Sequence, residues 1–520
     1  GTALRIHALA AEHEFAWHEL SRTLGRAPEG PIHAYIYRSE AQKRRLFGAG
    51  GVEVSLPWKR SLYLTAAAFP MRSLHHELAH TFGAAFGDPI LGLSMRWLPV
   101  PRFNTALLEG FAVAMDPRPR YRMDIHAQAA ALDALDLRPS LPALMGLGFY
   151  GYASSRAYTA SGSFVRWLLE TRGGARLGEL YGTAGDFEGV YGETLATLES
   201  QWLDFLGTVD VADDALASME ERFKRRSVFQ RPCAHRVARV RAEASRAQSS
   251  GDEALALELR NSLCELEPDR MEHYAALARV LATFHRFDDA FEVVARGWAV
   301  APKAHSAALD ASMAALEGDL RMATGELDGA VEAYERALSY PTDEATTRAV
   351  RLRRDAAADP AAAELIKRYF ARFERVRTDA SQRTRRLYVA SLLTPVTGWA
   401  RIGHYLLGRQ LLAVDDVSNA RAHLEAALDW PSPPSDDRAG PWPAPAASDP
   451  PLAPIYRRAA LRTLAEVTLR MGDLDGCAAV LDAWREIATE RGDLVALDKW
   501  SRRLAFHRSY TPRGNAEDGP

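Results

Sequence analysis

The spacing of hydrophobic and polar positions along this chain changes near residue 230. Up to about residue 228, short stretches that alternate apolar and polar positions lie between segments whose apolar residues recur every three to four positions. Such a mixture indicates strands interspersed with helices. From about residue 235 only the helical spacing remains. The sequence therefore predicts an α+β domain over residues 1–228, followed by an all-α region.

The first part of the α+β domain has recognisable boundaries. Residues 4–9 are predicted to form a strand, and residues 12–24 a helix that Gly25 ends. Residues 31–37 and 60–65 alternate in the manner of strands. The strand at 60–65 comes just before a motif discussed below, and we expect it to bind an extended peptide by strand addition.

Two helices are predicted next. One should begin at Pro70, because the missing N–H of proline is not needed in a first turn, and should run to Phe86. A second should begin near Asn104, a good N-cap residue, and stop before Pro117. Further helices between about 124 and 205 complete the domain.

The all-α region contains a repeat of 34 residues. Ala256 and Ala290 are 34 positions apart, and so are Pro268 and Pro302. This period, with a small residue between helices and a closing proline, resembles the tetratricopeptide repeat and implies a solenoid of helix pairs. Cys477 occupies the small-residue position of the last unit, which favours a packed thiol. The expected divisions are tetratricopeptide-like repeats at 229–345, a helical connector at 346–400, further repeats at 401–508 with a proline-rich loop at 431–454, and a loose tail at 509–520.

Bulk composition excludes some classes of protein. The 520 residues carry a formal net charge of −3, which gives no reason to expect nucleic acid as a partner. No stretch approaches the roughly 18 apolar residues that a membrane-spanning helix needs. The chain begins with Gly1 rather than Met, so the lack of a signal or anchor here does not indicate a cytoplasmic protein.

The segment His76-Glu77-Leu78-Ala79-His80 is the strongest chemical signal in the sequence. On a helix, His76 and His80 lie on one face and can present two imidazole nitrogens to one metal ion. Glu77 follows His76 directly, one position further round the helix from the histidine face, where its carboxylate can reach a metal-bound water. Glu109 on the next helix can add a third ligand, which leaves the fourth tetrahedral position open as catalytic zinc requires. The pattern predicts a zinc peptidase.

Alternative metal sites can be examined in the sequence itself. A metzincin would need a histidine at position 86, where Phe86 cannot bind zinc, and Asp88 is two residues too late. Glu109 is therefore the favoured third ligand. A metal-free helix with two ordinary histidines remains the simpler alternative. We interpret His75 as a second-shell or surface group and His126 as structural.

Residues 1 to about 208 resemble the gluzincin peptidases, most closely the bacterial peptidase MA-like domains. The resemblance covers the strand before the motif, the motif itself, Glu109-Gly110-Phe111-Ala112 and the segment at 158–164. It implies an α+β zincin-like fold in which Zn²⁺ is bound by His76, His80 and Glu109, with Glu77 as the general base. Tyr158 matches a tyrosine that stabilises the oxyanion in the aminopeptidase branch. A purely packing role for this ring is the alternative.

The chain also departs from that family. Thermolysin-like enzymes carry an aspartate four residues after the ligand glutamate, where this chain has Val113. Asp116 or Asp88 could take its role, and the alternative is that the groups around the ligands differ from those of the family. The strand with which aminopeptidases hold a free amine is not found, so endopeptidase action is favoured over aminopeptidase action.

The expected activity is zinc-dependent hydrolysis of a peptide or protein substrate, with a protein partner bound on the helical repeats. One alternative is a catalytically inactive zinc-binding scaffold. Another is a peptidase regulated by its helical half. The resemblance further implies a bacterial cell-envelope or extracytoplasmic location, with a membrane tether in the full-length protein.

Overall fold

The protein is mostly helical, with a small sheet near its N-terminus. The structure, a computed structural model, describes residues 2–510 except 67–68, 72, 98–101, 117–122, 212–215, 217–218, 221, 224–233, 301–304, 375–378 and 432–443. The expected boundary at 228/229, half of the proline-rich loop and nearly all of the tail at 509–520 lie outside the described residues.

The N-terminal part is built around a three-stranded sheet with the order β1-β3-β2. β1 is parallel to β3, with His33 opposite Ser61, and β2 is antiparallel to β3, with Leu56 opposite Ser61. A separate pair joins β4 to β5. The strands are β1 (His33–Tyr37), β2 (Val54–Leu56), β3 (Ser61–Thr65), β4 (Met95–Arg96) and β5 (Arg102–Phe103).

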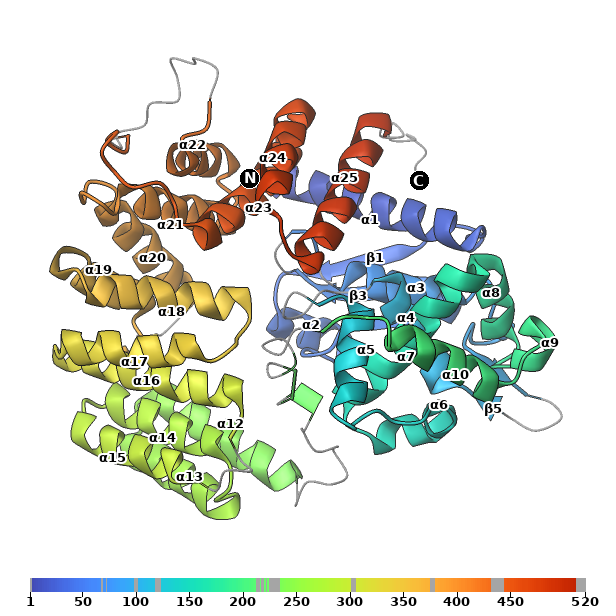
Figure 1. Cartoon of the computed structure of the whole chain (residues 1–520), viewed down its shortest axis with the longest axis horizontal. Helices are drawn as coiled ribbons and strands as arrows, with labels where there is room; N and C mark the ends of the chain where they lie inside the picture. Colours follow the sequence, from blue (N-terminus) through green and yellow to red (C-terminus); the bar gives the residue numbers. More distant parts are fainter. Residues whose placement is uncertain are drawn as a thin grey trace.

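Helices surround this sheet on the right of Figure 1. They are α1 (Thr2–Leu24), α2 (Glu40–Phe47), α3 (Leu74–Gly83), α4 (Thr105–Met115), α5 (Ile125–Ala134), α6 (Leu141–Leu144), α7 (Ser154–Arg172), α8 (Gly174–Gly182), α9 (Phe187–Tyr191) and α10 (Leu195–Leu206), with 3-10 turns η1 (Pro57–Lys59) and η2 (Gly146–Gly151). The α4 N-cap is Asn104 as expected, because its side chain accepts a hydrogen bond from the Leu107 N–H. The α3 helix, however, begins four residues later and ends three residues earlier than predicted.

The strand predicted at residues 4–9 is wrong, because these residues belong to α1. A six-residue apolar segment cannot be assigned to a strand or a helix by its spacing alone. Here the helix extends a continuous buried face that contains Phe15, Leu20 and Leu24. The strands predicted at 31–37 and 60–65 are confirmed as β1 and β3.

The expectation that the strand at 60–65 takes up a peptide is also wrong. β3 is the central strand and is hydrogen-bonded to β1 on one side and to β2 on the other. Strand addition needs unpaired N–H and C=O groups at a sheet edge. Within the described sheet those edges belong to β1 and β2.

The C-terminal part is a helical-repeat region. Figure 1 shows α12 to α24 as a curved stack beside the N-terminal domain. Its helices are α12 (Ala234–Ser250), α13 (Glu253–Leu266), α14 (Met271–Thr283), α15 (Phe287–Trp298), α16 (Ala307–Thr324), α17 (Leu327–Ser339), α18 (Glu344–Ala357), α19 (Pro360–Phe370), α20 (Asp379–Leu393), α21 (Ala400–Ala413), α22 (Val417–Leu428), α23 (Pro454–Arg470), α24 (Leu474–Ile487) and α25 (Arg491–Ser509).

Successive helices of this region pack as hairpins, among them α12 with α13, α14 with α15, α16 with α17, α21 with α22 and α23 with α24. A small residue is fully buried in the second helix of each of these five hairpins, where a larger side chain would separate the pair. These residues are Ala256, Ala290, Ala330, Ala420 and Cys477.

The end of the array returns to the N-terminal domain, where α25 lies beside α1 (Figure 1). Arg503 of α25 and Glu12 of α1 form an ion pair in which both side chains are only 1% exposed. Further ion pairs between the two parts are Arg502–Glu19, Lys499–Asp116 and Arg491–Asp124. The two parts are therefore joined by buried charge as well as by the chain.

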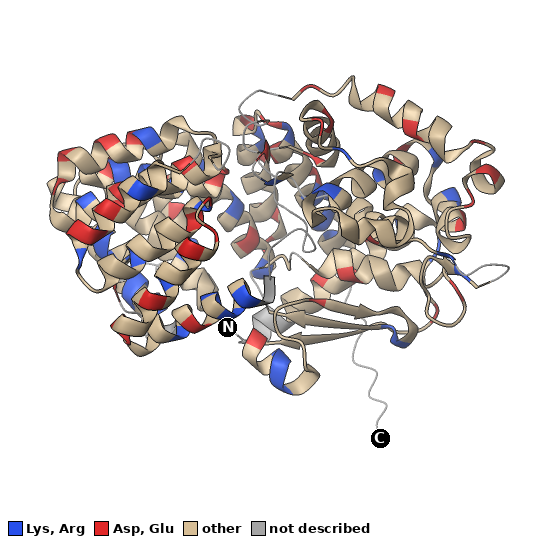
Figure 2. Ribbon diagram, turned by 90° about the horizontal axis from the view of Figure 1, so that it is seen from below, with Lys and Arg blue, Asp and Glu red and all other residues tan. Residues whose placement is uncertain are grey.

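Acidic and basic residues are interspersed over both parts (Figure 2). None of the helices among the described residues combines the length and the apolar character that crossing a membrane requires.

Candidate metal centre

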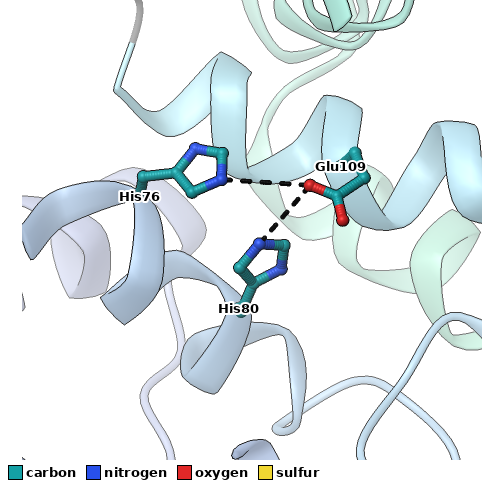
Figure 3. A group of neighbouring side chains, drawn as sticks. All are labelled: His76, His80 and Glu109. Carbon is teal, nitrogen blue, oxygen red and sulfur yellow. Dashed lines mark ion pairs between the residues drawn. The ribbon is translucent and has the colours of Figure 1, made fainter. Parts of the chain in front are cut away.

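Two helices bring the expected ligands together. His76 and His80 lie one turn apart on α3, with their ring centroids 5.0 Å apart, and Glu109 faces them from α4 (Figure 3). The Glu109 Oε2 atom is 3.9 Å from His76 Nε2 and 3.7 Å from His80 Nε2. One nitrogen or oxygen from each of the three residues lies within 4.8 Å of the other two.

The donor set and its spacing fit a zinc ion. Ligand atoms about 2.1 Å from a tetrahedral zinc lie roughly 3.4 Å from one another, so the observed separations need only a small contraction. Burial and the neighbouring charge of His76 lower the pKa of His80 to about 3. That imidazole is therefore neutral at physiological pH, which is the form that binds a metal.

Glu77 lies beside the three candidate ligands and does not belong to the group that they form. Its side chain is buried on the first turn of α3, with 9% of its surface exposed. It lies near enough to Tyr158 for its charge to contribute to raising the pKa of that phenol. A buried carboxylate next to the candidate metal ligands is suited to accept a proton at the site.

Tyr158 reaches the same place from α7. Its hydroxyl donates a hydrogen bond to the Glu109 carboxylate. Burial raises the pKa of Glu109, and this hydrogen bond lowers it by a smaller amount. Burial and then the charge of Glu109 raise the pKa of Tyr158, so the phenol keeps its proton at neutral pH. Its ring also packs edge-on against Phe149 at 5.1 Å. The side chain thus has both a packed ring and a polar end at the site.

Tyr150 is a neighbour that the sequence did not indicate. It lies on η2, is 50% exposed, and has its pKa raised by burial and then by the charge of Glu109. Its ring meets that of Phe149, which in turn contacts Tyr158. The only signal in the sequence is a glycine-rich segment that contains two aromatic residues, and nothing in its spacing relates it to the metal motif.

The other two histidines of interest are buried. His75 is 4% exposed and its ring packs edge-on against Phe15 of α1, so it is not a surface group. His126 is also 4% exposed, with Nδ1 3.0 Å from Ser163 Oγ and Nε2 3.2 Å from Glu170 Oε2. These contacts join α5 to α7 and give His126 a structural position.

The two aspartates considered as orienting groups have other partners. Asp88 accepts hydrogen bonds from the backbone N–H groups of residues 90, 91 and 93, and so closes its own loop. Asp116 at the end of α4 pairs with Lys499 of α25 at 2.8 Å. Val113 itself faces α7, where a Cβ atom at Gly162 would lie 2.3 Å from its side chain.

Comparison with known proteins yields distant structural similarity only. No family model matches the sequence, and no curated protein matches it. Among solved structures, the P58(IPK) TPR domain is similar at 14% sequence identity and a TM-score of 0.20. The similarity covers 51% of this chain and 64% of that chain. BtubC (BKLC) from P. vanneervenii is similar with 17% identity over 55% of this chain and 97% of its own length, also at 0.20. At that TM-score the helical-repeat assignment rests on the hairpins of this chain itself.

Proposed function

We propose that this chain is a zinc-dependent peptidase of the gluzincin type that carries tetratricopeptide-like repeats for protein binding. The observation that supports the hydrolytic part is the convergence of His76, His80 and Glu109 from two helices. Two imidazoles and one carboxylate are the ligand set of many catalytic zinc sites. A zinc ion held there would supply Lewis acidity, which lowers the pKa of water and polarises a carbonyl group.

The residues of the chain would perform the proton transfers. Glu77 would accept a proton from the attacking water and return it to the leaving amine. Tyr158 would donate a hydrogen bond to the carbonyl oxygen as negative charge develops there. In the structure the Tyr158 hydroxyl donates its hydrogen bond to Glu109, so substrate binding has to turn this hydroxyl toward the carbonyl oxygen.

Substrate would lie along the edge of β2 and not along β3. β2 is an edge strand, and its Ser55 Oγ lies 2.9 Å from Thr81 Oγ1 of α3, which ties this edge to the helix that carries both histidines. An extended peptide that adds to β2 would therefore pass beside the metal ligands.

The test compares wild type with Glu77→Gln by zinc stoichiometry and by digestion of a peptide library read by mass spectrometry. Wild type should bind one zinc per chain and cleave, and Glu77→Gln should keep the zinc and lose cleavage. Glu188→Gln, an exposed glutamate on α9, is the matched control. Cleavage by Glu77→Gln at the wild-type rate would refute the assigned base.

A second candidate is a zinc-binding scaffold whose function is protein interaction. The size of the helical-repeat region favours it, since that region occupies more than half of the described chain. One bound zinc per chain with no cleavage by either protein would support this candidate against the peptidase.

The envelope location remains a proposal that rests on the family resemblance. Fractionation of bacterial cells that express the full-length protein tests it, and recovery in the cytosolic fraction would contradict it.

A further inference from the structure

A row of arginines crosses the helical-repeat region. Arg279 of α14 lies close enough to Arg353 of α18 and to Arg372 for their charges to lower its pKa, in addition to the larger effect of burial. Arg372 is affected in the same way by Arg353 and Arg386. Side chains of like charge from α14, α18 and α20, and from the segment that follows α19, are thus close to one another.

Few carboxylates offset this charge in the first half of the row. Asp319 of α16 is the acidic residue at its centre: it pairs with Arg353, lies 3.5 Å from Arg372, and accepts a hydrogen bond from Tyr334 at 2.9 Å. Its single negative charge is therefore shared among several guanidinium groups. Among the described residues, Arg279 and Arg386 have no carboxylate within ion-pair distance.

The row continues into a cavity between the two parts of the protein. Arg386 and Arg409 both act on the pKa of Tyr369, which burial raises, so this ring links the row to α21. The cavity has a volume of about 540 Å³ and opens between Arg383 and Arg409 on one side and Arg38 on the other. Its other lining residues include Leu9, Ala66 and Phe69 of the N-terminal domain.

Three arginines at this cavity are left without an acidic partner. The two carboxylates that line it, Asp415 and Glu466, are both held by Arg470, at 2.9 and 3.3 Å. Arg409 donates to the Tyr405 hydroxyl at 3.3 Å. Within the described part of the chain, no carboxylate lies within ion-pair distance of the remaining guanidinium groups, those of Arg38, Arg383 and Arg409.

Such a row attracts a partner of opposite charge. We propose that this face, from Arg279 to the cavity at Arg383, binds an extended acidic segment of a partner polypeptide. This deepens the protein-binding part of the proposed function and rests on it. Solenoids of helix pairs present elongated surfaces of this kind. Because packed helices lie about 8–10 Å apart, a row that crosses α14, α18, α20 and α21 spans at least about 25 Å, the length of roughly eight extended residues.

The test measures binding of a fluorescein-labelled decapeptide of alternating Glu and Asp by fluorescence anisotropy. The protein is the full chain with Glu77→Gln, so that a bound peptide is not cleaved. The same decapeptide with Gln and Asn in place of the acids is the uncharged control. We expect the acidic peptide to bind at least tenfold more tightly, and its affinity to fall when salt is raised from 50 to 200 mM.

Two single variants probe the two sides of the cavity. Arg38→Glu and Arg383→Glu should each weaken binding by about fivefold, since each replaces an attraction by a repulsion. Both side chains are exposed and form no ion pair with the described residues, so the fold should be unchanged, and circular dichroism checks this. Arg368→Glu is the matched control, because Arg368 lies on α19, is 58% exposed and pairs with Glu364 of its own helix. It should bind as wild type does.

Three results would overturn the inference: equal binding of the acidic and uncharged peptides, wild-type affinity in both cavity variants, or a ten-nucleotide oligothymidylate that binds more tightly than the acidic peptide. These outcomes are distinguishable from failure of the hydrolytic proposal. Loss of peptide binding with cleavage intact removes only the acidic-partner inference, and peptide binding without cleavage removes only the peptidase.

Discussion

The buried ion pair between Glu12 and Arg503 gives the sharpest prediction for stability. The Arg503 Nε and Nη2 atoms each donate to one oxygen of Glu12 at 2.7 Å, and both side chains are 1% exposed. The guanidinium also lies over the rings of Phe15 at 4.9 Å and Trp500 at 4.8 Å. These two residues are 491 positions apart and connect the first described helix to the last.

Removing one partner of such a pair leaves the other charged, buried and without its ion partner, which costs about 3–5 kcal/mol. We therefore expect Glu12→Gln to lower the free energy of unfolding by about that amount. Replacing both partners by Glu12→Leu and Arg503→Met should recover most of the loss, because apolar side chains of similar size need no counter-charge. The exposed pair Arg508–Asp475 provides the control: Arg508→Met should cost less than about 1 kcal/mol.

Urea unfolding followed by tryptophan fluorescence measures these differences, and hydrogen exchange of the α1 and α25 amides shows whether the loss is local. A change below about 1 kcal/mol in Glu12→Gln, together with unaltered exchange in both helices, would refute the reasoning. It would mean that the two parts are not held together at this contact.

Three further predictions concern the site and one buried histidine pair. Glu109→Gln should lower zinc affinity at least about a hundredfold, measured by chelator competition, and unchanged affinity would exclude Glu109 as a ligand. Tyr158→Phe should reduce kcat by about 10²-fold with zinc content and KM unaltered, whereas a ring that only packs would leave kcat intact. His423 lies with its Nδ1 2.8 Å from His404 Nδ1, and burial followed by the His404 charge lowers its pKa to about 4. Since the unfolded imidazole titrates near pH 6.5, its stabilising contribution is complete above that pH and is lost as pH falls toward 4, by about 2 kcal/mol at pH 5. His423→Gln should flatten the unfolding free energy between pH 8 and pH 5, and an undiminished slope would contradict this assignment.

Local spacing was sufficient to predict the two histidines of the candidate metal centre and the start of the helix that carries Glu109. The four-residue interval between His76 and His80 fixes their common face on any helix, and the Asn104 cap fixes where the helix of Glu109 begins. The approach of the two helices, by contrast, depends on tertiary packing. It was expected because a catalytic zinc site needs a third ligand that Phe86 and Asp88 cannot supply, and the family resemblance implied the same residue, Glu109.

The predictions that failed, and the contacts that were missed, depend on information that no local stretch of the sequence carries. The order of strands in a sheet depends on pairing partners, so nothing within residues 60–65 shows that β3 is central. Tyr150 lies near enough to Glu109 to feel its charge because η2 packs against α4 and α7, a contact that no short motif encodes. Equally, the return of α25 to α1 joins residues at opposite ends of the chain and could not be read from either segment.

The close packing of α4 against α7 explains both the position of Tyr158 and the departure at Val113. A Cβ atom at Gly110 would lie 2.8 Å from the Ser161 carbonyl oxygen, and one at Gly162 would lie 2.3 Å from the Val113 side chain. The two helices can approach this closely only because each has a glycine at the contact. The approach places the Tyr158 hydroxyl against Glu109, the neighbour of Gly110. An aspartate at position 113 would put a charged group into this tightly packed contact, where burial without a partner is costly. The apolar residue at 113 therefore serves the helix contact that brings the phenol to Glu109, one of the candidate metal ligands.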